Sequence, residues 1–297
     1  MTDQKDIIIE NAIRIAEQTD SGSIFVFLAS QSEYRWWLRS GRTYSGQIIL
    51  VLPSDLKISE SGIRKSCRAV IRSWSGNQSR FSRIKYAFLH GVMQGLITSG
   101  SRVVCVLGPS GKNHLDTITV HDLSLSWSED YPFDVKGLIN NRAFHTIMAV
   151  ADIALDIGAL GREGKSVGTV FVIGDHVNVM KLSHQAVFNP FRGYARRERK
   201  ISRPEVVESM KELAKLDGAI IISGDGYVEA AGRHLDAGGA SAKTLRGLGA
   251  RHRAAAGISR RTEAVAIVVS ESTGKVTIFS NGCMIAALEP LISRRLV

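Results

Sequence analysis

Two short segments in the second half of the chain carry residues that could bind and activate a phosphate-bearing ligand. The first is 216–219, Leu-Asp-Gly-Ala, at the expected junction of a helix and a buried strand. Rigid elements would fix the Asp217 carboxylate there, and Gly218 and Ala219 let a planar ligand or a phosphate approach the backbone closely. Taken alone, Asp217 is better explained as a turn or capping residue.

The second segment, 247–259, places Arg251, His252 and Arg253 at the start of an expected helix that glycine precedes. Backbone N–H groups and the helix dipole attract anions at such a start, and guanidinium groups pair with phosphate oxygens. A basic helix start on the surface is the alternative, but it does not explain the flanking run of small residues. The segment therefore predicts phosphate binding.

Other familiar motifs fail on their spacing. The segment 108–112, Gly-Pro-Ser-Gly-Lys, follows an expected strand, but it has two residues between its glycines and Asn113 after the lysine, so it is not a P-loop. The Gly-Leu-Gly at 247–249 lacks the third glycine of a dinucleotide fingerprint, because His252 stands in its place. The eight histidines are scattered, which argues against a zinc site.

The charge balance indicates an anionic ligand without naming it. The chain has 38 Lys+Arg against 28 Asp+Glu, a net charge of +10, which attracts nucleotides, nucleic acid or acidic membrane. One basic run could contact nucleic-acid phosphates, but only Phe191 and Tyr194 are interleaved with it, so a solvated loop that packs on a neighbouring subunit is favoured. The run consists of Arg192, Arg196, Arg197, Arg199, Lys200 and Arg203.

The cysteines and the apolar stretches predict a cytoplasmic protein. The three cysteines are far apart in the sequence and are expected to be reduced thiols. Every long apolar stretch is interrupted before about 18 residues, so no membrane span is expected. The first residues lack the layout of a signal peptide.

The length of 297 residues and the apolar fraction of 44% allow two ordinary domains, and the pattern predicts an α/β fold. The first part alternates strands and helices, which predicts a small α/β layer domain with a largely parallel sheet. Its strands are expected at 23–28, 47–52, 102–107 and 117–121, and its helices at 7–16, 61–73 and 81–98.

The second part mixes helices with two hairpins, which predicts a central mixed β-sheet flanked by helices. Its helices are expected at 141–157 and from Pro204, with Ser202 as the cap, to about 216. Its strands are expected at 169–173, 219–223, 227–231, 264–270 and 275–279. The domain limits are therefore 1–122 and 133–297, joined by a linker at 123–132.

The two phosphate-binding segments, taken together and in this order, resemble the diadenylate cyclase (DAC) family. Six blocks match the family pattern, and they extend over most of residues 130–285: 168–175, 189–193, 216–219, 231–235, 249–255 and 268–271. The first part is similar in pattern to the C-terminal domain of pyruvate kinase, notably over 91–122. That arrangement looks like the archaeal-type diadenylate cyclases.

The resemblance implies the condensation of two ATP molecules into cyclic di-AMP, a second messenger, with release of two pyrophosphates. Two protomers of a homo-oligomer would face each other with one ATP each, and a divalent ion, Mn²⁺ or Mg²⁺, would bind Asp217. The implied catalytic residues are Asp217, Arg251, His252 and Arg253. The implied ATP-binding residues are Gly218, Ala219, Leu235, Gly249, Ser259, Ser270 and Glu271.

The chain departs from the family pattern at two positions. Ala250 stands where many relatives carry threonine, and Arg260 stands where they commonly carry an acid. Because the Asp217 and Arg251 pair is intact, an active enzyme is expected. A sensor that binds ATP or cyclic di-AMP without turnover is one alternative, and a nucleic-acid-binding protein is a second.

Overall fold

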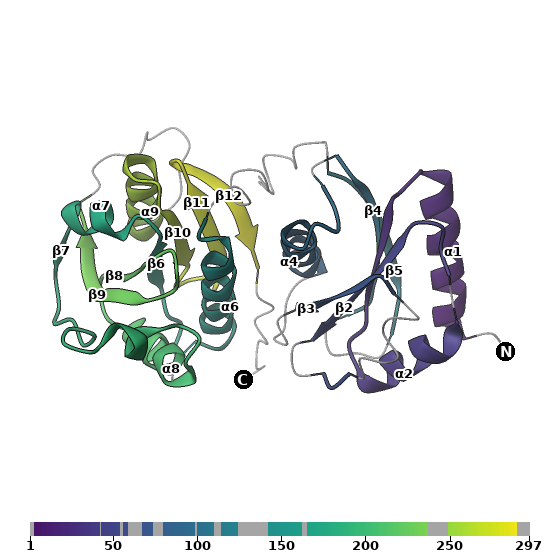
Figure 1. The fold of residues 1–297 in the computed structure, drawn as a ribbon, viewed down its shortest axis with the longest axis horizontal. Helices are drawn as coiled ribbons and strands as arrows, with labels where there is room; N and C mark the ends of the chain where they lie inside the picture. Colours follow the sequence, from purple (N-terminus) through teal and green to yellow (C-terminus); the bar gives the residue numbers. More distant parts are fainter. Residues whose placement is uncertain are drawn as a thin grey trace. The chain divides into compact units, whose positions relative to one another are not determined.

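The computed structural model describes residues 3–41, 43–53, 56–58, 67–73, 80–98, 100–109, 114–123, 142–161, 165–236 and 249–289. The chain divides into two compact units, Met1–Ser126 and Trp127–Val297 (Figure 1). The expected linker at 123–132 lies outside the described residues from position 124 onward. The domain limits therefore stay a prediction, and each unit is described by itself.

The first unit is a five-stranded sheet with the strand order β3-β2-β1-β4-β5. Four strands are parallel and β5 is antiparallel to β4, as the alternation of strands and helices predicted. The central strands are apolar almost without interruption because helices cover both of their faces. The strands are β1 (Ser23–Phe27), β2 (Gln47–Pro53), β3 (Ala69–Ser73), β4 (Arg102–Leu107) and β5 (Thr117–Asp122).

The helices of the first unit lie on opposite faces of its sheet (Figure 1). They are α1 (Gln4–Gln18), α2 (Gln31–Ser40) and α4 (Arg80–Met93). Ile9 of α1 and Trp37 of α2 share a buried cluster with Val26. Phe88 of α4 meets the neighbouring side chain on the other face, Phe25, edge to face at 5.5 Å between ring centroids.

Two expectations for the first unit need correction. The helix expected at 61–73 is wrong over 69–73, because this segment is β3 and pairs in parallel with β2; residues 61–66 lie outside the described residues. The helix α2 was not expected. It starts where Ser30 accepts a hydrogen bond from the Glu33 amide and the Glu33 carboxylate accepts one from the Ala29 amide, which is a capping arrangement that stabilises a helix start.

The second unit is a mixed seven-stranded sheet with the strand order β12-β11-β10-β6-β8-β9-β7, which confirms the predicted fold class. β6 and β8 are parallel, and every other neighbouring pair is antiparallel. The strands are β6 (Thr169–Ile173), β7 (Ser183–Gln185), β8 (Ala219–Ile222), β9 (Val228–Leu235), β10 (Val265–Val269), β11 (Val276–Ser280) and β12 (Cys283–Leu288).

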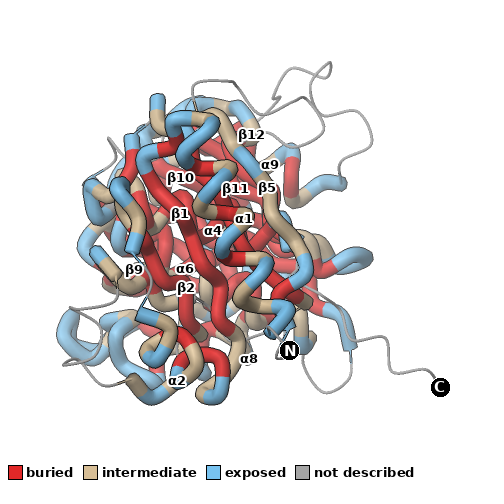
Figure 2. Tube along the Cα trace, turned by 90° about the vertical axis from the view of Figure 1, so that its right-hand side faces the viewer, coloured by how far each residue is buried: buried red, intermediate tan, exposed pale blue. Residues whose placement is uncertain are grey.

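Helices lie on both faces of this sheet (Figure 1). They are α6 (Phe144–Leu160), α7 (His176–Lys181), α8 (Pro204–Leu213) and α9 (Ala250–Arg261). Alternate residues of β6 and β10, such as Val172 and Val268, pack on Ala255 and Ile258 of α9 in one buried cluster. Figure 2 shows that β1 and β2 of the first unit are buried, and so are β10 and β11 of the second unit.

Most elements of the second unit follow the expected pattern, with β6 and both hairpins in the predicted places. Ser202 is not the cap of α8, because Arg203 occupies that position without a side-chain cap and Pro204 opens the helix. The short elements α7, β7 and β12 were not expected. Among the described residues, no helix has the length and apolar character needed to cross a bilayer.

Candidate active site

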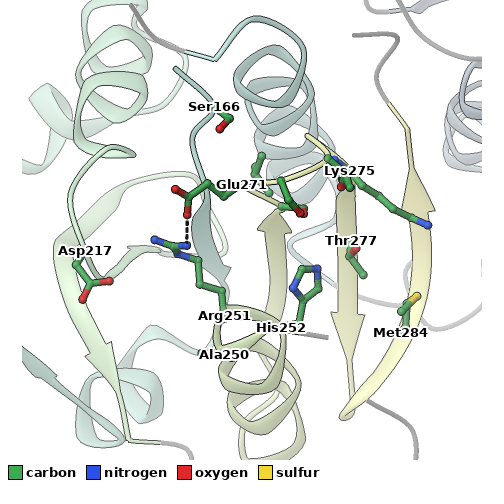
Figure 3. Close-up of a pocket in the computed structure, with 14 residues that line it drawn as sticks. Ser166, Asp217, Ala250, Arg251, His252, Glu271, Lys275, Thr277 and Met284 are labelled. Atoms are coloured by element: carbon green, nitrogen blue, oxygen red, sulfur yellow. Dashed lines mark hydrogen bonds and ion pairs between the residues drawn. The ribbon is translucent and has the colours of Figure 1, made fainter. Parts of the chain in front are cut away.

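A cleft of about 930 Å³ opens at one edge of the seven-stranded sheet (Figure 3). The residues before β6 and β8 meet the residues after β10 at this edge, because β8 runs parallel and β10 antiparallel to β6. The start of α9 and the strands β11 and β12 complete the walls. The lining residues are Ser166, Asp217, Gly249, Ala250, Arg251, His252, Val269, Ser270, Glu271, Ser272, Thr273, Lys275, Thr277 and Met284.

The cleft brings together members of both segments that the sequence singled out. Six of the predicted site residues line it: Asp217, Gly249, Arg251, His252, Ser270 and Glu271. Five others do not line it: Gly218, Ala219, Leu235, Arg253 and Ser259. A carboxylate and an arginine at a helix start thus share one cleft although they are 34 positions apart in the chain.

Asp217 lies on the turn between α8 and β8, at one side of the cleft (Figure 3). Its side chain is exposed, and Oδ1 accepts a hydrogen bond of 3.0 Å from the Gly218 amide. Gly218 has φ +106°, and a Cβ there would lie 2.6 Å from the carbonyl carbon of Gly232 in β9. Gly218 therefore lets the turn that carries Asp217 pass close to β9.

Arg251 lies in the first turn of α9, and its guanidinium points into the cleft (Figure 3). Gly249 precedes the helix with φ −70°, and no side chain caps this start. Helix N–H groups without a capping side chain suit an anion. Arg251 Nη1 lies 2.9 Å from Glu271 Oε2, and this ion pair is partly exposed.

His252 is 9% exposed, and its ring meets Phe279 of β11 at 6.2 Å between centroids. Burial, followed by the charge of Lys275, lowers the pKa of His252 below its ordinary value. The imidazole is therefore neutral at neutral pH, where it can donate or accept a hydrogen bond but adds no charge to the cleft.

The five predicted residues that do not line the cleft lie in other surroundings. Ala219 and Leu235 belong to the buried cluster that packs on α9. The Ser259 hydroxyl is fully buried, donates to the Ala256 carbonyl at 3.1 Å and accepts from the Gly282 amide at 3.2 Å. Gly218 supports the Asp217 turn, and Arg253 is exposed on the next position of α9. Their assignment as ATP-binding or catalytic residues stays a prediction.

Several lining residues were not singled out from the sequence. Lys275 immediately precedes β11 and Thr277 is its second residue, and the alternation of an extended chain places both on one face. Met284 lies on β12, which was not expected, so its place in the cleft was not predicted.

Three of the six residues of the basic run that suggested nucleic acid are paired with acids of the same unit. Ion pairs join Arg196 to Asp225 at 2.7 Å and Arg199 to Glu229 at 3.0 Å, and Arg203 pairs with its neighbour Glu205. The Arg196 guanidinium also lies over the Tyr227 ring at 4.4 Å. This local compensation favours the interpretation of the run as a solvated loop.

The mixed sheet and its cleft define an α/β domain with a candidate ligand site, and comparison with known proteins shows which family it resembles. Residues 156–284 match the family described as DAC, the DisA bacterial checkpoint controller nucleotide-binding domain. This part of the chain is similar to the DAC domain family, and the match covers less than half of the chain.

Two curated relatives are similar over longer stretches. The diadenylate cyclase of Methanocaldococcus jannaschii is 35% identical over 208 residues, which is 70% of this chain and 66%, just under two thirds, of that protein. The diadenylate cyclase of Haloferax volcanii is 28% identical over 272 residues, 91% of this chain and 94% of that protein. The similarity of the first unit to the C-terminal domain of pyruvate kinase stays a prediction.

Among solved structures, a double mutant of DacA from Staphylococcus aureus has a TM-score of 0.33 and 24% sequence identity. The match covers 47% of this chain and 84% of that one.

Proposed function

We propose that the chain is a diadenylate cyclase, a nucleotidyltransferase that condenses two ATP molecules into cyclic di-AMP and releases two pyrophosphates. The observation that carries the proposal is the shared cleft, in which Asp217 and the Arg251 helix start lie together within the region similar to the DAC family. Both curated relatives are named diadenylate cyclase, which supports the same reaction.

The cleft has room for a nucleotide. Sites for drug-sized ligands measure about 300–1,000 Å³, and the cleft of about 930 Å³ lies in this range. The family resemblance implies one ATP per protomer. A second ATP then comes from a facing protomer, and each ribose 3′-hydroxyl attacks the α-phosphorus of the opposite nucleotide. Two P–O bonds form, two pyrophosphates leave and both hydroxyl protons are released, so the reaction needs a homo-oligomer.

The charges of the chain suit this reaction, because phosphoryl transfer depends mainly on positioning and on neutralising phosphate charge. Arg251 has five N–H donors, and its bond to Glu271 leaves others for phosphate oxygens. The amides at the start of α9 supply further donors. His252, neutral and held by Phe279, offers a hydrogen bond without charge.

A divalent ion, Mn²⁺ or Mg²⁺, fits the donors that the cleft offers. Among the described residues, no three His, Cys, Asp or Glu side chains form a ready metal cage. Mg²⁺ is commonly held by one or two carboxylates together with substrate phosphates, so Asp217 suits an ion that arrives with ATP. When bound, the ion would neutralise phosphate charge and favour ionisation of the 3′-hydroxyl.

The free thiols of Cys67, Cys105 and Cys283 support a location in the reducing cytoplasm.

Incubation of the purified chain with ATP and either ion, followed by mass analysis of the products, tests the proposal. The expected products are cyclic di-AMP and pyrophosphate in a ratio of one to two, with none after chelation of the metal. If ATP binds but neither ion gives product, the proposal fails and a non-catalytic ATP or cyclic di-AMP sensor takes its place.

A further inference from the structure

Gly168 is the residue immediately before β6, and it is buried beside two residues that line the cleft. A Cβ at this position would lie 2.8 Å from Glu271 Cβ, 2.9 Å from Arg251 Nη1 and 3.1 Å from the Glu271 amide nitrogen. Optimal contacts between non-bonded carbon atoms are about 3.5–4.0 Å, so even an alanine is too large for this space.

We propose that Gly168 is a positioning residue for Arg251, an inference that rests on the proposed function of the cleft. The missing side chain leaves the space in which the Arg251 guanidinium pairs with Glu271 (Figure 3). Gly168 has no side chain to offer a phosphate, so it acts through the arginine alone.

The constraint at Gly168 is one of space and not of backbone conformation. Gly168 is not among the glycines of the chain with positive φ, so alanine can adopt its backbone angles. The residue stands next to the last pair of the β6–β10 ladder, Thr169 with Val269. A side chain at position 168 would therefore press on the turn that follows β10.

Both neighbours lie too close to such a side chain, but they differ in how they can move: Glu271 Cβ moves only with its backbone, whereas the Arg251 guanidinium can swing away. The turn after β10 is held by hydrogen bonds from the Ser270 amide to the Lys275 carbonyl at 2.9 Å and from the Gly274 amide to the Ser270 carbonyl at 2.8 Å. The Glu271 backbone is thus fixed on both sides. The Arg251 guanidinium, by contrast, is the far end of a flexible side chain that is 40% exposed.

Displacement of the guanidinium would break the ion pair with Glu271. Arg251 would then no longer be held in one orientation before ATP binds. A side chain that must be ordered on binding weakens affinity, whereas one that is already ordered does not. We expect an about three- to tenfold weaker affinity for ATP in Gly168→Ala.

A double-mutant cycle in the full chain tests this inference. Calorimetry measures the Kd of an ATP analogue with a methylene bridge between the α- and β-phosphates for the wild type, Gly168→Ala, Arg251→Ala and the double variant. Gly168→Ala is expected to weaken binding in the wild-type background and to have a clearly smaller effect in the Arg251→Ala background, where only the contact with Glu271 remains. An equal effect in both backgrounds, or wild-type affinity in Gly168→Ala, overturns the inference.

Gly224→Ala is the matched control for a glycine replacement in the same unit. Its Cβ would meet Ala143 Cβ at 3.4 Å, an ordinary contact, and it lies in the turn between β8 and β9 away from the cleft. Wild-type affinity is expected for it. If Gly168→Ala does not fold, Glu271→Gln replaces it in the cycle, because it keeps the side-chain volume but removes the charge that orients Arg251; its effect too must be clearly smaller in the Arg251→Ala background.

Product formation separates this inference from the proposed function. If the wild type binds the analogue but makes no cyclic di-AMP from ATP, the proposed function fails, and the binding cycle still decides whether Gly168 positions Arg251. If the wild type makes cyclic di-AMP and the cycle is additive, the positioning role alone fails.

Discussion

Replacement of Gly218 by alanine tests whether this glycine, next to Asp217, serves the fold or the ligand. Its φ of +106° is a conformation that side chains rarely adopt, and a Cβ would lie 2.6 Å from the Gly232 carbonyl carbon and 2.8 Å from the Arg233 amide nitrogen. Strained backbone costs about 1–3 kcal/mol, and overpacking costs about another 1–3 kcal/mol.

β9 has little freedom to move away from such a side chain. The Gly232 carbonyl accepts hydrogen bonds from the Ala186 and Val187 amides at 2.9 and 3.2 Å, and Arg233 is paired with Ala219 in the ladder. The two costs therefore add, and we expect Gly218→Ala to lower the local free energy of opening by about 2–6 kcal/mol.

Hydrogen exchange measured on peptides from β8 and β9 reports this loss directly. Gly249→Ala is the control, because φ at Gly249 is −70° and a Cβ there would meet nothing within 4 Å. Unchanged exchange in Gly218→Ala, together with a loss of ATP affinity, would refute the argument and would show that Gly218 serves the nucleotide.

Two further predictions concern groups outside the cleft. Burial lowers the pKa of His121 to about 4 from its usual 6.5. The contribution of the neutral imidazole to the free energy of unfolding is therefore fully present above about pH 6.5, and up to about 3 kcal/mol is lost as the pH drops to 4. Urea unfolding across this range checks the slope, which His121→Gln is expected to flatten; an equal slope in both proteins would contradict the assignment. Ser259→Ala removes the acceptor of the Gly282 amide and is expected to cost about 1 kcal/mol of stability at unchanged ATP affinity. Calorimetric binding that weakens while thermal stability stays constant would instead place the hydroxyl at the nucleotide.

Most of the strands and helices around the cleft could be predicted from the sequence. The unbroken apolar run of β6 and the Asp-Gly turn between β8 and β9 are strong local signals, and the apolar run of β8 places Asp217 just before a strand start. The glycine before Arg251 marks the helix start in the same way. The positions of Asp217 and Arg251 depend on residues next to them in the sequence, and for this reason both could be predicted to lie at the start of an element.

The errors come from elements whose signals are weak or were overlooked. Asn281 and Gly282 both have positive φ and form the turn from β11 to β12; an Asn-Gly pair is a strong hairpin signal, and it would have predicted β12 and Met284. Pairing with β2, which lies far away in sequence, makes 69–73 a strand instead of a helix.

Packing roles could not be separated from binding roles by sequence. Leu235 and Ala219 were singled out within family-like blocks and Ser259 near one, but their side chains are buried in the structure, where they pack or bond within the unit. The space that Gly168 leaves for Arg251 depends on a contact between three separate segments, which only the folded chain reveals.

The comparison of Asp217→Asn with the wild type tests the central claim most directly, with Asp116→Asn, on a partly exposed ion pair of the first unit, as control. Cyclic di-AMP formation from ATP and Mn²⁺ is measured beside the affinity for the ATP analogue. The account predicts that Asp217→Asn abolishes turnover and largely keeps nucleotide binding, while Asp116→Asn changes neither. Turnover at the wild-type rate in Asp217→Asn would contradict the assignment of this cleft as the catalytic site.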